Sequence, residues 1–432
     1  MIIGTGIYLS FCTGFVQIRL FPRALRAFLR QFRKDGRTGG TSPYRALCTA
    51  LAATVGTGNL AGVAGAIAVG GPGAIFWMWV CAFLGMATKF SEAVLAVRYR
   101  IQNEKGEWVG GPMHMIRQGL GEHWKLLAAV YAFFGVVAAL GVGNATQINA
   151  VISGIGSVMN LCGKEMRTKD ALMIGIILAV AITSTLAGGA GCIGRTAEKI
   201  VPVAAAFYIL LGIVALGLRA NAIPNALSSI FYGAFSPRAV TGGVLGSAFV
   251  AVRVGAARGV FTNEAGMGTA SIAHAGAEVR EPAEQGLMGI MEVFIDTLVI
   301  CTITALVILC SGISIPYGCD VGVMLTVDAF SAVFGDWITV PIAICLCAFA
   351  IATVLGWSLY GVRCSQYLFG DGVWRHFAFL QGVMVIIGAI LGTGTVWILS
   401  EMVNGLMAIP NLIALTLLSP ELCRLIRKRR PS

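Results

Sequence analysis

The sequence predicts an all-α integral membrane protein with about eleven transmembrane helices. Of its 432 residues, 57% are hydrophobic and only 12% are charged, which is too little charge to cover the surface of a soluble domain. The runs Ala171–Ala187 and Val201–Leu218 contain no acidic or basic residue. Each approaches the length of about 20 residues that a helix needs to cross a hydrocarbon core. Because these runs are apolar on every side, they indicate helices rather than the alternating strands of a barrel.

The predicted helices divide into one leading helix and two sets of five. The leading helix covers Ile2–Phe21. The first set covers Tyr44–Val69, Ala74–Val97, Leu126–Ile155, Ala171–Leu186 and Val201–Leu218. The second set covers Val240–Ala275, Leu287–Cys310, Trp337–Gly361, Phe377–Leu391 and Val396–Leu418. We therefore divide the chain into 1–37 (a transmembrane helix and a basic loop), 38–220 (the first five-helix repeat) and 221–432 (the second repeat and a basic tail).

The net charge of +11 is concentrated at helix ends. Arg19–Arg37 contains seven Lys or Arg residues, and Arg424–Arg430 contains five more. The positive-inside rule places both clusters in the cytoplasm, so the N-terminus is expected outside. This pattern explains the charge without a nucleic-acid partner. The first apolar segment has no basic residue before it, unlike a cleaved signal peptide, and is expected to remain as a membrane helix.

Two predicted helices carry glycine-rich interruptions at matching places in the two repeats. The first is Val55–Asn59 and the second is Gly255–Gly259. Glycine adopts backbone angles that other residues avoid, and non-helical backbone at membrane depth is tolerated where it lines a cavity. Two matched breaks therefore predict the binding site of a transporter. The alternative is that these glycines only allow helices to pack closely.

The same segments carry a family resemblance. Long motifs of the chain are similar to the signature of the alanine/glycine:cation symporter family: Leu51–Val63, Gly70–Trp79, Gly85–Glu92, Gly110–Met113, Arg258–Gly268, Ile272–Ala275 and Gly356–Gly361. The resemblance implies a LeuT-like, five-plus-five inverted-repeat fold with one extra helix in front. It also implies symport of alanine, glycine and similar small neutral amino acids, driven by Na⁺ or H⁺, in a prokaryotic plasma (inner) membrane.

The resemblance also implies a set of binding residues. The amides of Thr57 and Gly58 would hold the substrate carboxylate, and Asn59 offers one more oxygen. The carbonyl groups of Ala52 and Val55 would coordinate the cation together with the hydroxyl of Thr353, since hard cations prefer oxygen. The chain departs from the common family pattern at two places. It has Ala352 where family members commonly have a hydroxyl residue, and it has Val362 and Arg363 where an acidic residue is common.

Two amides on the fourth helix are further candidates. Asn144 and Gln147 are three residues apart, so they are expected to share a helix face. The resemblance makes Gln147 a contact for the substrate amino group. The alternative for both residues is an interhelical hydrogen bond.

Other candidates are bulky or charged. Phe261 and Trp357 are expected to wall off the substrate side chain or simply to pack. Arg258 and Glu264 are expected to hold or gate the second break, and Asp296 is a candidate proton site, because charged groups inside a membrane are costly.

No cofactor is expected beyond the coupling cation, and the chain has no GxxxxGK[ST] loop for ATP. No nucleophile–base pair or metal cluster points to an enzyme. The alternatives to symport are an uncoupled or exchange-type carrier and, less well supported, a channel or sensor on the same fold.

Overall fold

The computed structural model describes residues 1–31, 41–235, 248–319, 322–391 and 393–427, with the backbone only for 393–401. The chain is almost entirely helical. The first half contains α1 (Ile2–Cys12), α2 (Val16–Arg19), α3 (Phe21–Gln31), α4 (Pro43–Thr54), α5 (Ala61–Gly70), α6 (Gly73–Arg98), α7 (Pro112–Leu120), α8 (Lys125–Leu140), α9 (Thr146–Leu161), α10 (Thr168–Ala187) and α11 (Gly189–Leu218). A short antiparallel hairpin of β1 (Ile101–Gln102) and β2 (Trp108–Val109) lies between α6 and α7.

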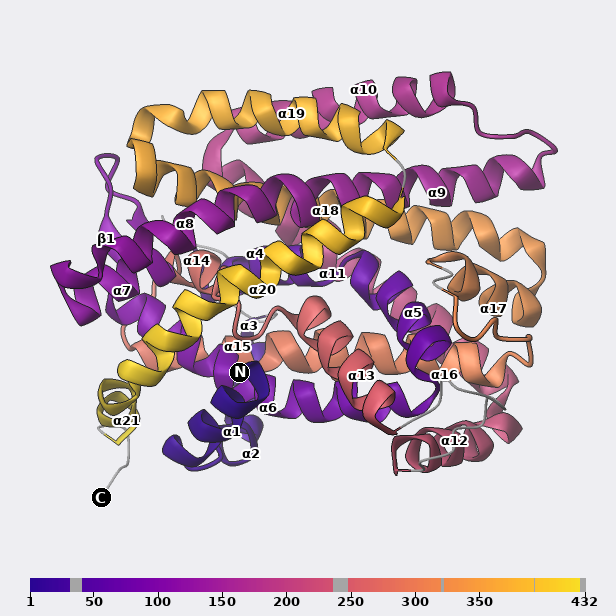
Figure 1. Ribbon diagram of the computed structural model, residues 1–432, viewed down its shortest axis with the longest axis horizontal. Coiled ribbons are helices and arrows are strands. Elements are labelled where there is room, and N and C mark those ends of the chain that lie inside the picture. The colour runs from indigo at the N-terminus through magenta and orange to yellow at the C-terminus, as the bar shows by residue number, and fades with distance from the viewer. Residues whose placement is uncertain (32–40, 236–247, 320–321, 392, 428–432) are drawn as a thin grey trace.

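The second half continues with α12 to α21. Their bounds are α12 (Ile223–Phe235), α13 (Ala248–Asn263), α14 (Thr269–Ala275), α15 (Pro282–Val293), α16 (Thr302–Cys310), α17 (Met324–Phe334), α18 (Thr339–Phe369), α19 (Trp374–Ile390), α20 (Thr393–Leu417) and α21 (Ser419–Arg427). Two π-helical segments, Gly141–Ala145 and Phe294–Cys301, join α8 to α9 and α15 to α16. Figure 1 shows most of the long helices lying along one direction, with α7 and α21 toward one end and α12 and α17 toward the other.

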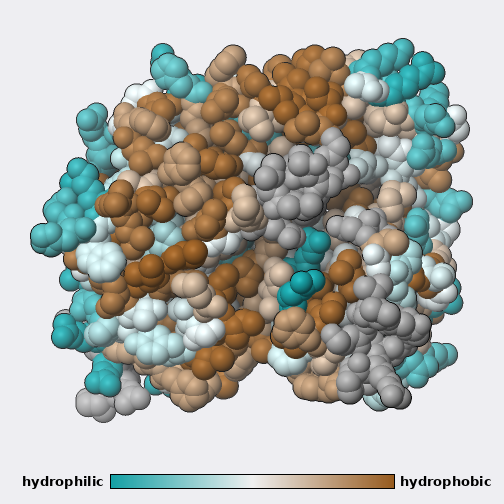
Figure 2. Space-filling view, in the orientation of Figure 1, coloured by the Kyte–Doolittle hydropathy of each residue, from teal (hydrophilic) through white to brown (hydrophobic). Residues whose placement is uncertain are grey.

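An apolar belt surrounds the bundle. Among the described residues, seven helices are long and apolar enough to cross a membrane, or up to nine if each of two bent pairs is one span. Large apolar side chains such as Ile177, Val180 and Val203 face outward with 62%, 63% and 71% of their surface exposed. In Figure 2 apolar residues cover much of the middle of the visible face, and hydrophilic ones gather at its left and right ends. These features confirm an all-α, multi-pass membrane protein.

The structure corrects several predicted helix boundaries. The predicted Ile2–Phe21 helix is split, because Gly14 and Phe15 have positive φ angles of 64° and 52°; that this segment crosses the membrane stays a prediction. Helix α11 begins at Gly189, so its basic residues near Arg195 lie within the helix rather than before it. The short helices α12 and α17 were not predicted. Residues 32–37, 240–247 and 428–430 of the predicted elements lie outside the described part of the chain.

The first break is where the sequence predicts it. Helix α4 ends at Thr54, a 3₁₀ turn covers Thr57–Asn59, and α5 begins at Ala61. The two helical halves are bent by 59°. The prediction of an unwound segment over Val55–Asn59 is therefore confirmed.

The prediction for the second break is wrong in its position. Helix α13 runs without interruption through Gly255 and Gly259, and the chain leaves the helix only after Asn263. A Cβ atom at Gly255 would lie 2.3 Å from the Ala74 carbonyl oxygen on α6, so this glycine allows close helix packing. The break instead covers residues 264–268, where Glu264, Gly266 and Gly268 have φ angles of 54°, 92° and 78°. Positive φ angles cannot continue a right-handed helix, which explains the interruption.

A buried carboxylate holds the second break in place. Oε1 of Glu92, on α6, accepts hydrogen bonds from the backbone amides of Gly266 and Gly268, both at 3.0 Å. The Nδ2 of Asn411, on α20, donates to the same oxygen at 2.7 Å. Within the break, the Thr269 hydroxyl donates to Glu264 Oε2 at 2.5 Å. Glu264 therefore connects the start of the break to Thr269, the first residue of α14.

Lys89 and Glu292 form an ion pair beneath this break. Lys89 Nζ on α6 lies 2.8 Å from Glu292 Oε1 on α15, and neither side chain is exposed. The Nε2 of His274 lies 2.9 Å from the other oxygen of Glu292, and Gln285 Nε2 lies 2.7 Å from His274 Nδ1. Both oxygens of Glu292 are thus occupied, and the network joins α6, α14 and α15.

The helix contact at Gly255 gives a first prediction. Gly255→Ala should lower the free energy of unfolding by about 1–3 kcal/mol, because the new methyl group collides with the α6 backbone. Gly217→Ala in α11 is the matched control, since nothing lies within 4 Å of its Cβ position. That variant should be unchanged or more stable by about 0.5–1 kcal/mol. Thermal unfolding of both purified variants tests this; equal midpoints would contradict the packing account.

The buried ion pair gives a second prediction. Lys89→Met should lower the free energy of unfolding by about 3–5 kcal/mol, because Glu292 loses its buried partner. The control is Arg117→Met, which removes an ion pair with side chains 39% and 66% exposed and should cost less than about 1 kcal/mol. The double variant Lys89→Met with Glu292→Gln should recover part of the loss. Denaturant unfolding measures all three, and similar losses for Lys89→Met and Arg117→Met would refute the prediction.

Candidate functional site

The first break exposes backbone groups that a continuous helix would use. The Gly56 amide, which would otherwise donate to the Ala52 carbonyl four residues earlier, donates to Asn59 Oδ1 at 2.8 Å. The side chain of Asn59 thus fixes the turn. The Ala52 carbonyl lies in the last turn of α4, where helix carbonyl groups lack intrahelical partners and carry partial negative charge.

Thr57 contacts Gln147 across the bundle. The Thr57 hydroxyl donates to Gln147 Oε1 at 3.0 Å, and the Thr57 amide lies 3.4 Å from the same oxygen. Gln147 comes from α9 and is only 3% exposed. Its Nε2 donates to the Val142 carbonyl at 3.3 Å. The structure therefore brings together the two residues that were predicted to bind the carboxylate and the amino group of a substrate.

Thr353 approaches the same break from α18. Its hydroxyl donates to the Phe349 carbonyl at 2.9 Å and lies 3.5 Å from the Val55 carbonyl oxygen. A Cβ atom at Gly56 would be only 2.5 Å from Thr353 Oγ1 and 3.3 Å from Gln147 Oε1. Residue 56 must therefore be glycine for these two side chains to approach the break. The oxygens of Val55 and Thr353 form the kind of donor set that a hard cation such as Na⁺ prefers.

The two aromatic candidates lie in different places. Phe261 Cδ1 of α13 lies 3.6 Å from the position that a Gly58 Cβ would take. Trp357 of α18 packs on Gly143, where an added Cβ would come within 2.2 Å of Trp357 Cβ. Phe261 therefore lies directly beside the predicted carboxylate-binding turn. Trp357 packs against the π-helical segment that precedes Gln147.

Asn144 lies apart from this group. Its Nδ2 donates to the side chain and to the backbone carbonyl of Gln381 on α19, the latter at 3.0 Å. Gly141–Ala145 is π-helical, so the α-helical spacing used to place Asn144 and Gln147 on one face does not apply across it, and the two side chains have different partners. The contact is the interhelical hydrogen bond that the sequence left open as the alternative for Asn144.

Asn59 connects the first break to the second half of the chain. Its Nδ2 donates to Asp296 Oδ1 at 2.7 Å and to the Asp296 carbonyl at 3.2 Å. The Thr297 hydroxyl donates to the other carboxylate oxygen at 2.7 Å. Both polar ends of the Asn59 side chain are thus committed to holding the protein together. Arg258, the remaining candidate, is half-buried on α13, and its carbonyl accepts a hydrogen bond from the Thr262 hydroxyl.

Sequence reasoning did not single out Lys89, Glu92 and Asn411. Lys89 and Glu92 lie in the motif Gly85–Glu92, but the motif was used only for the resemblance. The rule that charged groups inside membranes are functional candidates would have identified them. Asn411 carries no comparable signal, because a lone amide in a helix commonly forms an interhelical hydrogen bond.

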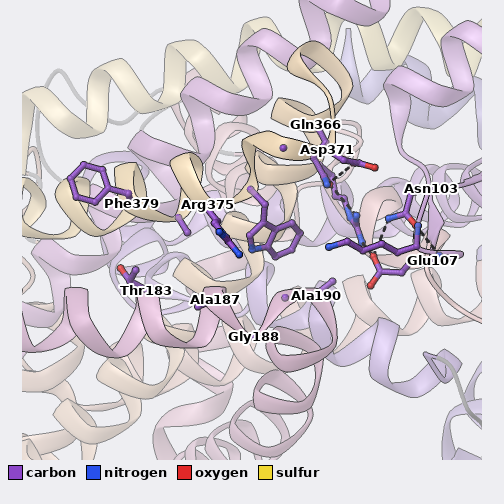
Figure 3. A pocket seen from close by; sticks show the side chains of 16 residues that line it. Asn103, Glu107, Thr183, Ala187, Gly188, Ala190, Gln366, Asp371, Arg375 and Phe379 are labelled. Atoms are coloured by element: carbon purple, nitrogen blue, oxygen red, sulfur yellow. Dashed lines mark hydrogen bonds and ion pairs between the residues drawn. The ribbon is translucent and has the colours of Figure 1, made fainter.

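A cavity of about 860 Å³ lies elsewhere, between the hairpin, the α10–α11 turn and the start of α19 (Figure 3). There Arg363 Nη2 lies 2.9 Å from Glu107 Oε2, and Gln366 links Arg363 to Asp371. Burial alone would raise the pKa of Glu107, but the hydrogen bond and charge of Arg363 outweigh it and lower the pKa. The residues that line this cavity include none of the predicted substrate or cation ligands.

Solved structures share the arrangement of the helices. The chain superposes on the transporter MhsT, solved in complex with L-phenylalanine, with a TM-score of 0.62 and 15% identity over 89% of this chain and 90% of that one. It superposes on Mhp1, a nucleobase-cation-symport-1 family transporter, with a TM-score of 0.55 and 13% identity over 92% and 97%. This likeness confirms the LeuT-like transporter fold.

Sequence comparison covers almost the whole chain. The sodium/alanine symporter AgcS of Methanococcus maripaludis is 43% identical over 97% of this chain and 91% of its own. The probable sodium/glutamine symporter GlnT of Bacillus subtilis is 35% identical over 97% of this chain and 84% of its own. The family model described as the sodium:alanine symporter family matches residues 1–430. The chain therefore belongs to the sodium:alanine symporter family.

Proposed function

We propose that this protein is a secondary active transporter that carries alanine, glycine and similar small neutral amino acids together with Na⁺. The observation that carries the proposal is the first break. It places backbone amides at Thr57 and Gly58, and carbonyl groups at Ala52 and Val55, on the two sides of one interrupted helix. The amides suit an anion and the carbonyls suit a cation, so one element binds both partners of a symport cycle.

The substrate would bind along this turn as a zwitterion. Its carboxylate would accept hydrogen bonds from the Thr57 and Gly58 amides, taking the place that Gln147 Oε1 now occupies beside Thr57. Gln147 Oε1 would then turn to the ammonium group. The space beside Gly58 is small, because a Cβ atom added to this residue would lie 3.3 Å from Thr262 Oγ1. With Phe261 and Trp357 as walls, the pocket would admit a hydrogen atom or a methyl group as the substrate side chain.

Na⁺ is the favoured coupling ion because the donors are neutral oxygens. Ala52 and Val55 would supply carbonyl groups and Thr353 a hydroxyl, which need no deprotonation to bind a cation. Ala352 gives no second hydroxyl, and this is the observation that favours the runner-up, an exchange-type carrier with weak or no ion coupling. The AgcS relative is itself described as a sodium/alanine symporter.

Alternating access requires that the substrate path through the protein can close at one end. Arg45 Nε of α4 lies 2.8 Å from Glu198 Oε2 of α11, and Arg363 pairs with Glu107 of the hairpin. We assign this end to the cytoplasm of a prokaryotic plasma membrane, with the N-terminus outside, because basic clusters mark it. Opening would separate Arg45 from Glu198 and move α4 away from α11. Arg258 and Glu264 would guide the corresponding movement at the second break.

The third prediction tests the cation site. In sealed vesicles containing the purified protein, an inward Na⁺ gradient should drive labelled alanine above its equilibrium level. Thr353→Val keeps the shape but removes one oxygen ligand, which should raise the Na⁺ concentration for half-maximal uptake by about tenfold, equivalent to about 1.4 kcal/mol. Thr185→Val is the control, because that hydroxyl donates to the Ala181 carbonyl of its own helix α10 and has no other hydrogen bond among the described residues.

The outcomes separate the two candidate functions. Alanine accumulation without any response to Na⁺ would reject Na⁺ coupling, and alanine/alanine exchange alone would establish the exchange-type carrier. If Thr353→Val and Thr185→Val have the same Na⁺ dependence, Thr353 is not a cation ligand. No uptake of alanine or glycine under any ion gradient would reject the proposed substrates.

A further inference from the structure

The second break encloses more acidic than basic groups. Lys89, Glu92 and Glu292 are completely buried, and Glu264 is 3% exposed. Lys89 and Glu292 form one ion pair, while Glu92 and Glu264 accept hydrogen bonds from neutral donors. Two further ionised carboxylates in so small a buried volume would be costly, and protonation is the usual way in which proteins avoid that cost.

The contacts of Glu92 are strongly asymmetric. All three of its hydrogen-bond donors, the amides of Gly266 and Gly268 and the Asn411 Nδ2, point to Oε1. Its other oxygen, Oε2, is buried and has no donor among the described residues. The same holds for Oδ1 of Asn411, whose Nδ2 already bonds to Glu92. Two acceptor atoms without donors therefore belong to two buried side chains that are in direct contact.

We propose that Glu92 and Asn411 form a binding site for one exchangeable proton, distinct from the substrate and Na⁺ sites and coupled to the transport cycle. The proton forms an O–H bond at Glu92 Oε2 and donates to Asn411 Oδ1. This completes a cyclic pair of hydrogen bonds, since Asn411 Nδ2 already donates to Oε1. The proton comes from water on one side of the membrane and returns to water. The coupling to alanine rests on the proposed function.

One proton satisfies both unpartnered acceptors. The other titratable groups that interact with Glu92 are Lys89 on α6, Glu292 on α15, Tyr131 on α8 and Tyr360 on α18. Two more belong to the same cluster, since Glu264 in the break interacts with Lys89 and His274 on α14 contacts Glu292. The hydroxyl groups of Tyr131 and Tyr360 are buried and have no partner among the described residues. They are the polar groups available to relay a proton toward this site.

The position of Glu92 explains how a proton could affect transport. Hydrogen bonds to an ionised carboxylate are roughly twice as strong as those to a neutral acceptor. Loss of the proton therefore tightens the hold of Glu92 on the Gly266 and Gly268 amides, and protonation loosens it. Because these glycines are two of the three residues with positive φ in the second break, the charge on Glu92 biases the angle between α13 and α14.

The fourth prediction uses Glu92→Gln, which imitates the protonated side chain. Glutamine keeps an acceptor for the three donors and adds an N–H group that can reach Asn411 Oδ1, so the fold is retained. In vesicles with an enclosed pH indicator, wild-type protein should move protons when alanine and Na⁺ are supplied. The variant should move none, and its alanine exchange should no longer change with pH. Glu104→Gln, which removes an exposed carboxylate of the hairpin, should behave like wild type.

Infrared difference spectra test the proton site without transport. Lowering the pH of the wild-type protein should produce the C=O stretch of a protonated carboxyl group, which is missing in Glu92→Gln and kept in Glu104→Gln. A band that persists in Glu92→Gln would overturn the proposal. A carboxylate signal of Glu92 that responds to Na⁺ but not to pH would do the same by identifying a metal site. If wild-type protein takes up no alanine, the proposed function fails, while these spectra still decide the proton site.

Discussion

Backbone polar groups at membrane depth must find partners inside the protein, and the rest of this structure depends on how that demand is met at two interrupted helices. Each interruption frees amides and carbonyl groups that lipid cannot satisfy. At the first break, Asn59 Oδ1 takes the Gly56 amide. At the second, Glu92 Oε1 takes those of Gly266 and Gly268. The breaks persist because buried side chains replace the missing helical bonds.

The two breaks use different chemistry, and this separates their functions. The first break is fixed by the neutral side chain of Asn59, which also donates to the buried carboxylate of Asp296. The helix ends at this break carry partial charges of the kind that suit a zwitterion and a small cation. The second break is held by a carboxylate and lies next to the Lys89–Glu292 pair. The proposed substrate and cation ligands lie at the first break, while the buried ion pair and the proposed proton site lie at the second.

The sequence predicts the membrane class, the position of the first break and the approach of Thr353 and Gln147 to it. The position of the second break could not be predicted from the glycines in the sequence. Glycine at residue 255 serves packing against α6, whereas glycines at 266 and 268 adopt left-handed backbone. Both uses look alike in a sequence, since the difference lies in neighbours far along the chain. For Asn144 the structure shows the interhelical hydrogen bond that was the alternative, next to a π-helical turn that residue spacing alone does not reveal.

The bond between Asn59 and Asp296 also constrains how the protein is made. The two residues are 237 positions apart, so the partner of Asn59 is synthesised long after the first broken helix has left the ribosome. At roughly 5–20 residues per second, this interval is on the order of 10–50 s. During that time Asn59 Nδ2 lacks its native partner Asp296 in the nascent chain. Water or the insertion machinery must supply a hydrogen-bond partner for this group. The first half of the transporter therefore reaches its native structure only after the second half has been synthesised.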